Sequence, residues 1–195
     1  MNKSKVNLGL IKPKSPTNVG GVMRAAGCFR VDAVFYTGER YARAARFNMD
    51  TKNVSGQIPL TGVDSLLDHV PENTKIVCVE LVEGAIPLPE YQHPNRAFYI
   101  FGPEDGTISQ DILDRADDVV YVPTIGCMNL AASVNVVLYD RMVKSTQTIA
   151  NNELILKSRD TNNKVKVKTP EKPGSDPSVR SKLLLSFNNL VSSLR

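Results

Sequence analysis

The sequence predicts an α/β protein built on a mostly parallel sheet with helices on both faces. Short apolar segments alternate along the chain with longer segments of helical pattern, the order expected when helices connect parallel strands. The apolar segments are continuous runs rather than alternating ones, so each strand should be covered on both sides. Hydrophobic residues make up 42% and charged residues 23% of the 195 residues, which is typical of a globular protein and excludes a wholly disordered chain.

Five apolar runs have the length and composition of buried strands. They are residues 6–11, 33–37, 75–81, 97–101 and 118–122. The segments between them predict helices, and Thr17 or Asn18 is expected to cap the first, with Asp64 capping a short later one. The predicted helices are residues 17–29, 64–70, 109–116 and 129–150, and the segment 38–60 is polar and irregular.

The composition changes after the last of these helices, so the chain is expected to have three parts. Residues 1–150 form the α/β domain. Residues 151–177 are rich in Lys, Asn, Pro, Gly and Ser, which is typical of a linker or arm. The basic excess of the chain lies in residues 157–182, which hold eight Lys and Arg residues and three acids. Residues 178–195 predict an amphipathic helix, since apolar side chains recur there at helical spacing.

Charge and cysteine usage narrow the class of protein. The net charge of +4 permits an anionic partner without requiring one. Cys28, Cys78 and Cys127 are widely separated, which argues against a disulfide framework and against a zinc site. We interpret His69 as a surface residue at a helix end and His93 as a turn residue, so neither a metal site nor a catalytic histidine is expected.

No run approaches the roughly 20 apolar residues that span a bilayer, and no signal peptide pattern is present, so we expect a cytoplasmic protein without a membrane partner.

Three loops follow predicted strands at their carboxyl ends, the edge at which open parallel sheets bind ligands. They are residues 18–24, 102–106 and 122–130. Each has an ordinary structural explanation by itself. Asn18 and Asn129 could be helix caps, the Asp-Gly pair could mark a turn, and Cys127 could be a small buried residue. Three such loops at the same edge nevertheless indicate a ligand site.

These loops give the sequence its resemblance to a known family. The first loop matches N-x-G-x-x-x-R through Asn18, Gly20 and Arg24. Residues 99–104 match an apolar strand followed by the start of G-x-E-x-x-G, and residues 122–130 match a third motif that leads into an apolar helix. In these motifs the sequence resembles the SpoU/TrmH-type RNA 2′-O-methyltransferases of the SPOUT class, over roughly residues 6–145.

The resemblance implies a sheet whose C-terminal part is threaded as a trefoil knot, a connection that sequence physics alone does not predict. It also implies S-adenosylmethionine as methyl donor, S-adenosylhomocysteine as product, and no metal. The cofactor is held largely through backbone groups in this family. By position, the implied cofactor-binding residues are Val79, Glu80, Leu81, Gly102, Val122, Cys127 and Met128.

The same resemblance implies methyl transfer to a ribose 2′-hydroxyl of tRNA or rRNA, with tRNA favoured. Arg24 would bind the target phosphate and stabilise developing alkoxide charge, because a guanidinium with a pKa above about 12 is a poor base. Asn18 would position Arg24 or the ribose, Glu104 would orient backbone or Arg24, and Asn129 would fix the cofactor loop. Arg24 would act with the pocket of the other subunit, so a homodimer with a shared active site is implied. The predicted RNA-binding arginines are Arg24, Arg40, Arg43 and Arg46.

Two other functions fit the residues. One is methylation of a base nitrogen, as in related SPOUT families. The other is a non-catalytic RNA-binding or assembly protein that keeps the knotted fold. Gly106 stands one position earlier than the second motif places its glycine, and the loop after Pro123 is short. Binding of S-adenosylmethionine separates an enzyme from an assembly protein.

Overall fold

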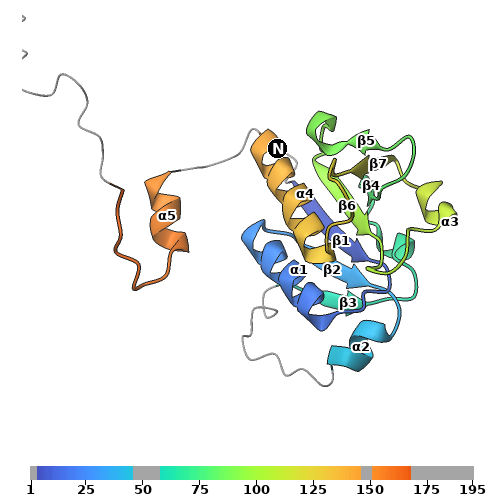
Figure 1. The fold of residues 1–195 in the computed structure, drawn as a ribbon, viewed down its shortest axis with the longest axis horizontal. Coiled ribbons are helices and arrows are strands. Elements are labelled where there is room, and N and C mark those ends of the chain that lie inside the picture. The colour runs from blue at the N-terminus through green and yellow to red at the C-terminus, as the bar shows by residue number, and fades with distance from the viewer. Residues whose placement is uncertain (1–3, 46–57, 146–150, 168–195) are drawn as a thin grey trace, which may run out of the picture. The chain divides into compact units, whose positions relative to one another are not determined.

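The computed structural model describes residues 4–45, 58–145 and 151–167 (Figure 1). The chain divides into two units, Met1–Thr148 and Ile149–Arg195. Within the described part of the second unit, α5 (Asn152–Ser158) forms a short exposed helix that the sequence analysis did not predict. The predicted helix 178–195 and Arg46 lie outside the described residues. No helix among the described residues is long and apolar enough to span a bilayer.

The first unit is built on a seven-stranded sheet in which every pair of neighbouring strands is parallel. Its spatial order is β3-β2-β1-β6-β4-β7-β5. The strands are β1 (Lys5–Leu10), β2 (Ala33–Tyr36), β3 (Leu60–Gly62), β4 (Lys75–Val79), β5 (Ile86–Pro87), β6 (Arg96–Phe101) and β7 (Asp118–Tyr121). The predicted fold class is therefore confirmed, and the five long apolar runs are the five principal strands. β3 and β5, both very short, were not predicted.

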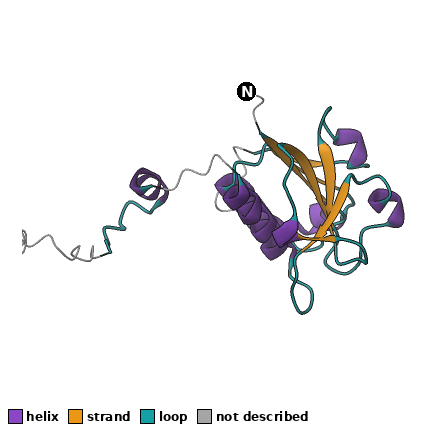
Figure 2. Ribbon diagram, turned by 90° about the horizontal axis from the view of Figure 1, so that it is seen from above, coloured by secondary structure: helices purple, strands orange, loops and turns teal. Residues whose placement is uncertain are grey.

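Alternate residues of the central strands supply two separate cores, which explains why these strands are apolar throughout. Tyr99 and Phe101 of β6 belong to one buried cluster, whereas Phe98 and Ile100 belong to the other. Figure 2 shows the long helices on one face of the sheet and short helical turns on the other. Helices on both faces exclude water from both sides of the strands, as the continuous apolar runs predicted.

The two long helices of the first face are α1 (Pro16–Cys28) and α4 (Leu130–Lys144), and they pack closely on each other (Figure 1). A side chain at Gly21 would place its Cβ 2.8 Å from the Cβ of Ala131, so the helices can approach this closely only because residue 21 is glycine. The other face carries α3 (Gln110–Leu113) and a 3₁₀ turn at Leu67–His69. α2 (Arg40–Ala45) lies in the segment for which no regular structure was predicted.

Residues 18–24, expected as the first of the three loops, lie within α1, and several helix ends also differ from the sequence expectations. Ser15, rather than Thr17 or Asn18, is the N-cap of α1, because its hydroxyl accepts a hydrogen bond from the backbone N–H of Asn18. The predicted helix 64–70 is only the 3₁₀ turn. The helix expected to extend to residue 150 ends at Lys144, since Ser145 has extended backbone angles.

The interpretation of His93 as a simple turn residue was wrong. Its side chain is only 4% exposed and lies between two partners. Nδ1 is 2.6 Å from the Tyr99 hydroxyl, and Nε2 is 2.8 Å from a carboxylate oxygen of Asp140. Lys144 forms an ion pair with the same carboxylate and donates hydrogen bonds to two backbone carbonyls of residues 88–91. This network ties the end of α4 to the segment that leads into β6.

Candidate S-adenosylmethionine and RNA site

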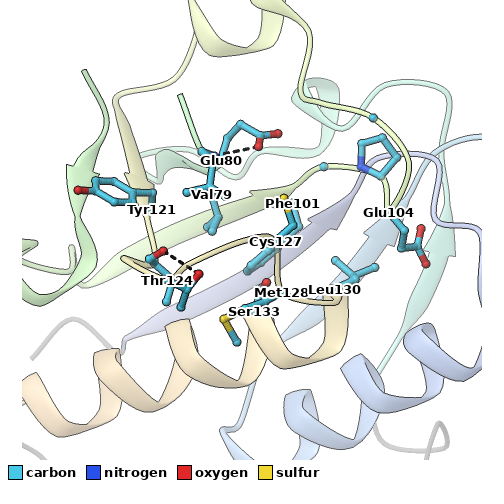
Figure 3. Close-up of a pocket in the computed structure, with 15 residues that line it drawn as sticks. Val79, Glu80, Phe101, Glu104, Tyr121, Thr124, Cys127, Met128, Leu130 and Ser133 are labelled. Atoms are coloured by element: carbon cyan, nitrogen blue, oxygen red, sulfur yellow. Dashed lines mark hydrogen bonds between the residues drawn. The ribbon is translucent and has the colours of Figure 1, made fainter. Parts of the chain in front are cut away.

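A cavity opens at the carboxyl edge of the sheet, where β4, β6 and β7 end at Val79, Phe101 and Tyr121 (Figure 3). Its other walls come from loop 102–106, loop 122–129 and the first turns of α4. All seven residues expected to bind the cofactor line this one cavity: Val79, Glu80, Leu81, Gly102, Val122, Cys127 and Met128. The second and third motifs, which are separated in the sequence, therefore meet at the same place.

The close approach of Glu80 favours glycine at position 102. A Cβ at residue 102 would lie 3.0 Å from Oε2 of Glu80 and 3.4 Å from Cγ1 of Ile108. That carboxylate oxygen accepts a hydrogen bond of 3.0 Å from the backbone N–H of Ile108, while Oε1 accepts one of 2.9 Å from Leu81. The side chain of Glu80 thus fixes the far end of the loop that Gly102 begins.

The loop of the third motif is held by short-range hydrogen bonds. The Thr124 hydroxyl donates to the carbonyl of Gly126 at 3.0 Å and, over a longer 3.4 Å, to that of Val122 (Figure 3 draws the second of these). Gly126 has a φ of +87°, a conformation that glycine adopts without strain. Asn129 is the N-cap of α4, because its Oδ1 accepts a hydrogen bond of 2.7 Å from Ala132. The ordinary capping explanation therefore accounts for the Asn129 side chain. Cys127, two residues earlier, is exposed at the cavity wall.

The structure brings Asn18 and Glu104 into contact. Oε1 of Glu104 accepts hydrogen bonds from the Asn18 side-chain amide (3.0 Å) and the Ser15 backbone (3.2 Å), and Oε2 accepts one of 2.8 Å from Lys14. Burial alone would raise the pKa of Glu104, but these hydrogen bonds outweigh it and lower the pKa from its ordinary value. Glu104 therefore remains charged and fixes the start of α1 against the loop of the second motif.

Arg24 is not in contact with either residue. It lies on the exposed surface of α1, does not line the cavity, and makes no hydrogen bond or ion pair within the described residues. The structure of one chain consequently joins Asn18 to Glu104 but leaves Arg24 with its guanidinium in solvent.

Two of the other predicted RNA-binding arginines, Arg40 and Arg43, have acidic partners. Arg40 forms two hydrogen bonds with Asp105, and Arg43 pairs with Glu39 one helical turn away. Asp105, which was not predicted as a site residue, lies in loop 102–106 beside Glu104 but does not line the cavity. Its partner Arg40 lies 65 residues away in the sequence, so local sequence gives no signal of the pair.

Comparison with known proteins identifies the family of the chain. The model of the SpoU rRNA Methylase family matches residues 5–139, more than half of the chain. A comparison with curated protein sequences gave no significant match.

Solved structures show the same fold at low identity. The TrmH/SpoU tRNA modifying enzyme of A. aeolicus is 15% identical, with a TM-score of 0.59 over 72% of this chain and 75% of that one. The SpoU methyltransferase AviRb from Streptomyces viridochromogenes, in complex with the cofactor AdoMet, is 18% identical, with a TM-score of 0.59 over 72% and 58%.

A third structure, described as giving insights into the 2-OH methylation of C/U34 on tRNA, is 22% identical, with a TM-score of 0.58 over 73% of this chain and 97% of that one. The chain thus spans little more than half of AviRb but nearly all of the third structure. At these identities the likeness shows the fold, and the family model shows the family. The chain therefore belongs to the SpoU rRNA methylase family, a family of RNA methyltransferases.

Proposed function

We propose that this protein transfers a methyl group from S-adenosylmethionine to a ribose 2′-hydroxyl of tRNA. The observation that carries the proposal is the cavity at the carboxyl edge of the sheet. Its walls are the loops of the second and third motifs, and its rim residue Glu104 holds Asn18 of the first motif. Each motif has an ordinary structural explanation by itself, as a helix cap, a turn or a buried residue. Those explanations do not require residues of all three motifs to meet at one place.

The residues of the cavity fit S-adenosylmethionine. Val122, Met128 and Leu130 offer apolar surface for a purine ring, while the Glu104 carboxylate at the rim favours a ligand with a positive charge. Gly102 leaves the main chain open at the strand end, where a side chain would collide with Glu80. When bound, the cofactor supplies an activated methyl group on a sulfonium ion.

The remaining chemistry falls to the residues of α1. Arg24 binds the phosphate beside the target ribose and stabilises the negative charge that develops on the 2′-oxygen as its proton passes to solvent water and the methyl group is transferred. Asn18 positions the ribose or Arg24, and Glu104 holds Asn18 in place. The exposed position of Arg24 outside its own cavity supports a homodimer in which Arg24 of one subunit serves the cavity of the other. The trefoil knot implied by the resemblance stays a prediction, as does a cytoplasmic location.

The choice of tRNA rests on the comparisons. The structure described for tRNA methylation is matched over 97% of its length, by 73% of this chain. The choice of the ribose rests on the motifs that the sequence shares with 2′-O-methyltransferases, with Asn18 and Arg24 in the first motif and Asn129 in the third.

Transfer of tritiated methyl groups to tRNA and to rRNA tests the proposal. We expect label in tRNA, and we expect alkaline hydrolysis to leave it in a dinucleotide, because a 2′-O-methyl group prevents cleavage of the adjacent phosphodiester. Label released in a mononucleotide would indicate base methylation instead. Binding of RNA without binding of S-adenosylmethionine or S-adenosylhomocysteine would favour the assembly protein.

Arg24→Ala tests the role of the arginine. We expect kcat to fall by about 100-fold or more, the usual effect of removing a group that stabilises developing charge. Arg115→Ala is the matched control, because Arg115 is also exposed but follows α3 away from the cavity. An Arg24→Ala enzyme with unchanged kcat would contradict the role.

A further inference from the structure

Two consecutive acidic residues of loop 102–106 hold two different parts of the chain. Glu104 binds the start of α1 through Lys14, Ser15 and Asn18. Asp105 binds Arg40, the first residue of α2. The loop that forms one wall of the cavity is therefore attached to the segment in which the sequence predicts RNA-binding arginines.

The contact between Asp105 and Arg40 is bidentate. Nη1 donates to Oδ1 at 2.9 Å and Nη2 donates to Oδ2 at 2.7 Å, which fixes the planes of both groups. Lys14 adds a weaker approach of 3.9 Å to the same carboxylate. The hydrogen bonds from Arg40, followed by the nearby charges of Arg40 and Lys14, lower the pKa of Asp105, so the pair is charged throughout the neutral range.

Asp105 is placed between residues that line the cavity without lining it itself. Gly102, Pro103, Glu104 and Gly106 all contribute to the wall. The carboxylate of Asp105 instead lies against α2. Loop 102–106 thus has one side toward the cavity and one side toward Arg40.

Arg40 is itself anchored. Tyr41, the next residue, packs edge-on against Tyr36 at the end of β2, with 5.0 Å between ring centroids, and both pack against the main core. The backbone beside Arg40 is therefore fixed to the sheet. Through its contact with Asp105, the Arg40 guanidinium holds the loop in a fixed position relative to the sheet. An exposed ion pair contributes little to global stability, so its main consequence here is local order.

We propose that Arg40 and Asp105 are positioning residues for the cofactor, holding loop 102–106 in the shape that binds S-adenosylmethionine. The inference rests on the proposed function and assigns Arg40 to the cofactor wall rather than to the RNA surface. When the pair is broken, the loop adopts several conformations. Part of the free energy of cofactor binding is then used to order the loop, so the affinity falls.

Calorimetric titration with S-adenosylhomocysteine tests the proposal on the full-length protein. Arg40→Gln and Asp105→Asn should each raise Kd about threefold to fivefold, the range that an exposed ion pair supplies. The double variant should show no further loss, because both changes remove the same interaction. In methyl transfer, KM for S-adenosylmethionine should rise with kcat unchanged.

Glu39→Gln is the matched control. It breaks the other exposed ion pair of this segment, with Arg43, which does not reach loop 102–106. Its Kd should equal that of the unaltered protein, and hydrogen exchange at residues 102–106 should accelerate only in the Arg40 and Asp105 variants.

Other results would overturn the inference. Unchanged Kd in both single variants, or additive losses in the double variant, would show that the pair does not shape the cavity. An Arg40→Gln protein that loses RNA affinity but keeps cofactor affinity would show that Arg40 contacts RNA and does not support the cofactor loop. Failure of the unaltered protein to bind S-adenosylmethionine and S-adenosylhomocysteine would overturn the proposed function itself, and this inference with it.

Discussion

Glu104 shows how one side chain links two motifs that are distant in the sequence. It accepts three hydrogen bonds, two from the backbone at the start of α1 and one from Asn18. Glu104→Gln keeps the size but replaces one acceptor oxygen with a donor, which faces an N–H group of the chain. We expect the free energy of unfolding to fall by about 1 kcal/mol, at the low end for bonds to a charged group because the carboxylate is partly in solvent.

This substitution can affect both the stability of the protein and the positioning of Asn18, and activity measurements distinguish the two effects. If Glu104 positions Asn18, the rate of methyl transfer should fall by more than the loss of folded protein explains. Urea denaturation and single-turnover rates measured on the same preparation give both quantities. Asp111→Asn, an exposed acid in α3, should change neither. A Glu104→Gln protein with full activity would mean that Asn18 needs no such support.

His93 leads to a prediction about pH. Burial lowers its pKa from the ordinary value of 6.5, and the nearby charges of Arg141 and Lys144 act in the same direction, whereas Asp140 opposes them. The unfolded chain therefore binds a proton more readily than the folded one. Stability should be fully present above about pH 6.5 and should fall as the pH drops through the folded pKa.

Denaturation at a series of pH values measures this effect. His93→Gln should be less stable near pH 7.5 and should lose less stability between pH 6.5 and 5, since the substituted residue does not titrate there. His69→Gln is the control, because His69 is exposed and stacks on Phe35. If both variants keep the acid sensitivity of the unaltered protein, His93 is not its source.

Polar residues of this kind mark the limit of what the sequence predicts. His93 precedes a proline and has the local pattern of a turn, and its burial depends on Tyr99 and on Asp140, 47 residues later. Asp105 and Arg40 are likewise paired only by the fold. Local sequence carries no information about such partners, whereas continuous apolar runs are visible in the sequence itself.

At the scale of elements, the close packing of α1 on α4 gives two adjacent glycines different surroundings. A Cβ at Gly21 would lie 2.8 Å from the Cβ of Ala131, but a Cβ at Gly20 would meet nothing within 4 Å. Gly21→Ala should therefore destabilise the protein by about 1–3 kcal/mol through overpacking. Gly20→Ala should leave stability unchanged or raise it by up to about 1 kcal/mol through helix propensity.

Thermal denaturation of the two variants gives a direct comparison, since the change in side chain is identical. Equal effects would show that the helices adjust at no cost. Gly20 is also the glycine of the first motif, although no described part of this chain approaches it. A stable Gly20→Ala protein with reduced methyl transfer would indicate that its partner is substrate, cofactor or a second subunit.

The elements themselves were predicted unevenly, for physical reasons. Strands such as β6 are apolar on both faces, and their limits were predicted within one or two residues. The cap of α1 was missed because Ser15, Thr17 and Asn18 are all good capping residues within four positions. β3 and β5 are so short that pairing with a neighbour, rather than their own composition, makes them strands.

At the scale of the molecule, the positions of the cofactor residues derive from one rule. Carboxyl ends of parallel strands meet at the same edge, so loops after β4, β6 and β7 had to come together. The rule places Val79, Gly102 and Val122 around one cavity, as observed. It does not place Arg24, which lies on a helix surface, and that residue's proposed role depends on a second subunit.

The basic segment 157–182, in the second unit, supports a prediction about RNA. It holds eight lysines and arginines against three acids, whereas every residue of the cavity lies in Met1–Thr148. A chain that ends at Thr148 should therefore bind S-adenosylhomocysteine with unchanged Kd but bind tRNA more weakly. Its log Kd for tRNA should also depend less steeply on log salt concentration, because fewer phosphates are neutralised. Titrations at several salt concentrations measure that slope. Equal slopes for the two chains would show that the segment does not contact RNA, and a loss of cofactor affinity would show that the first unit depends on residues 149–195.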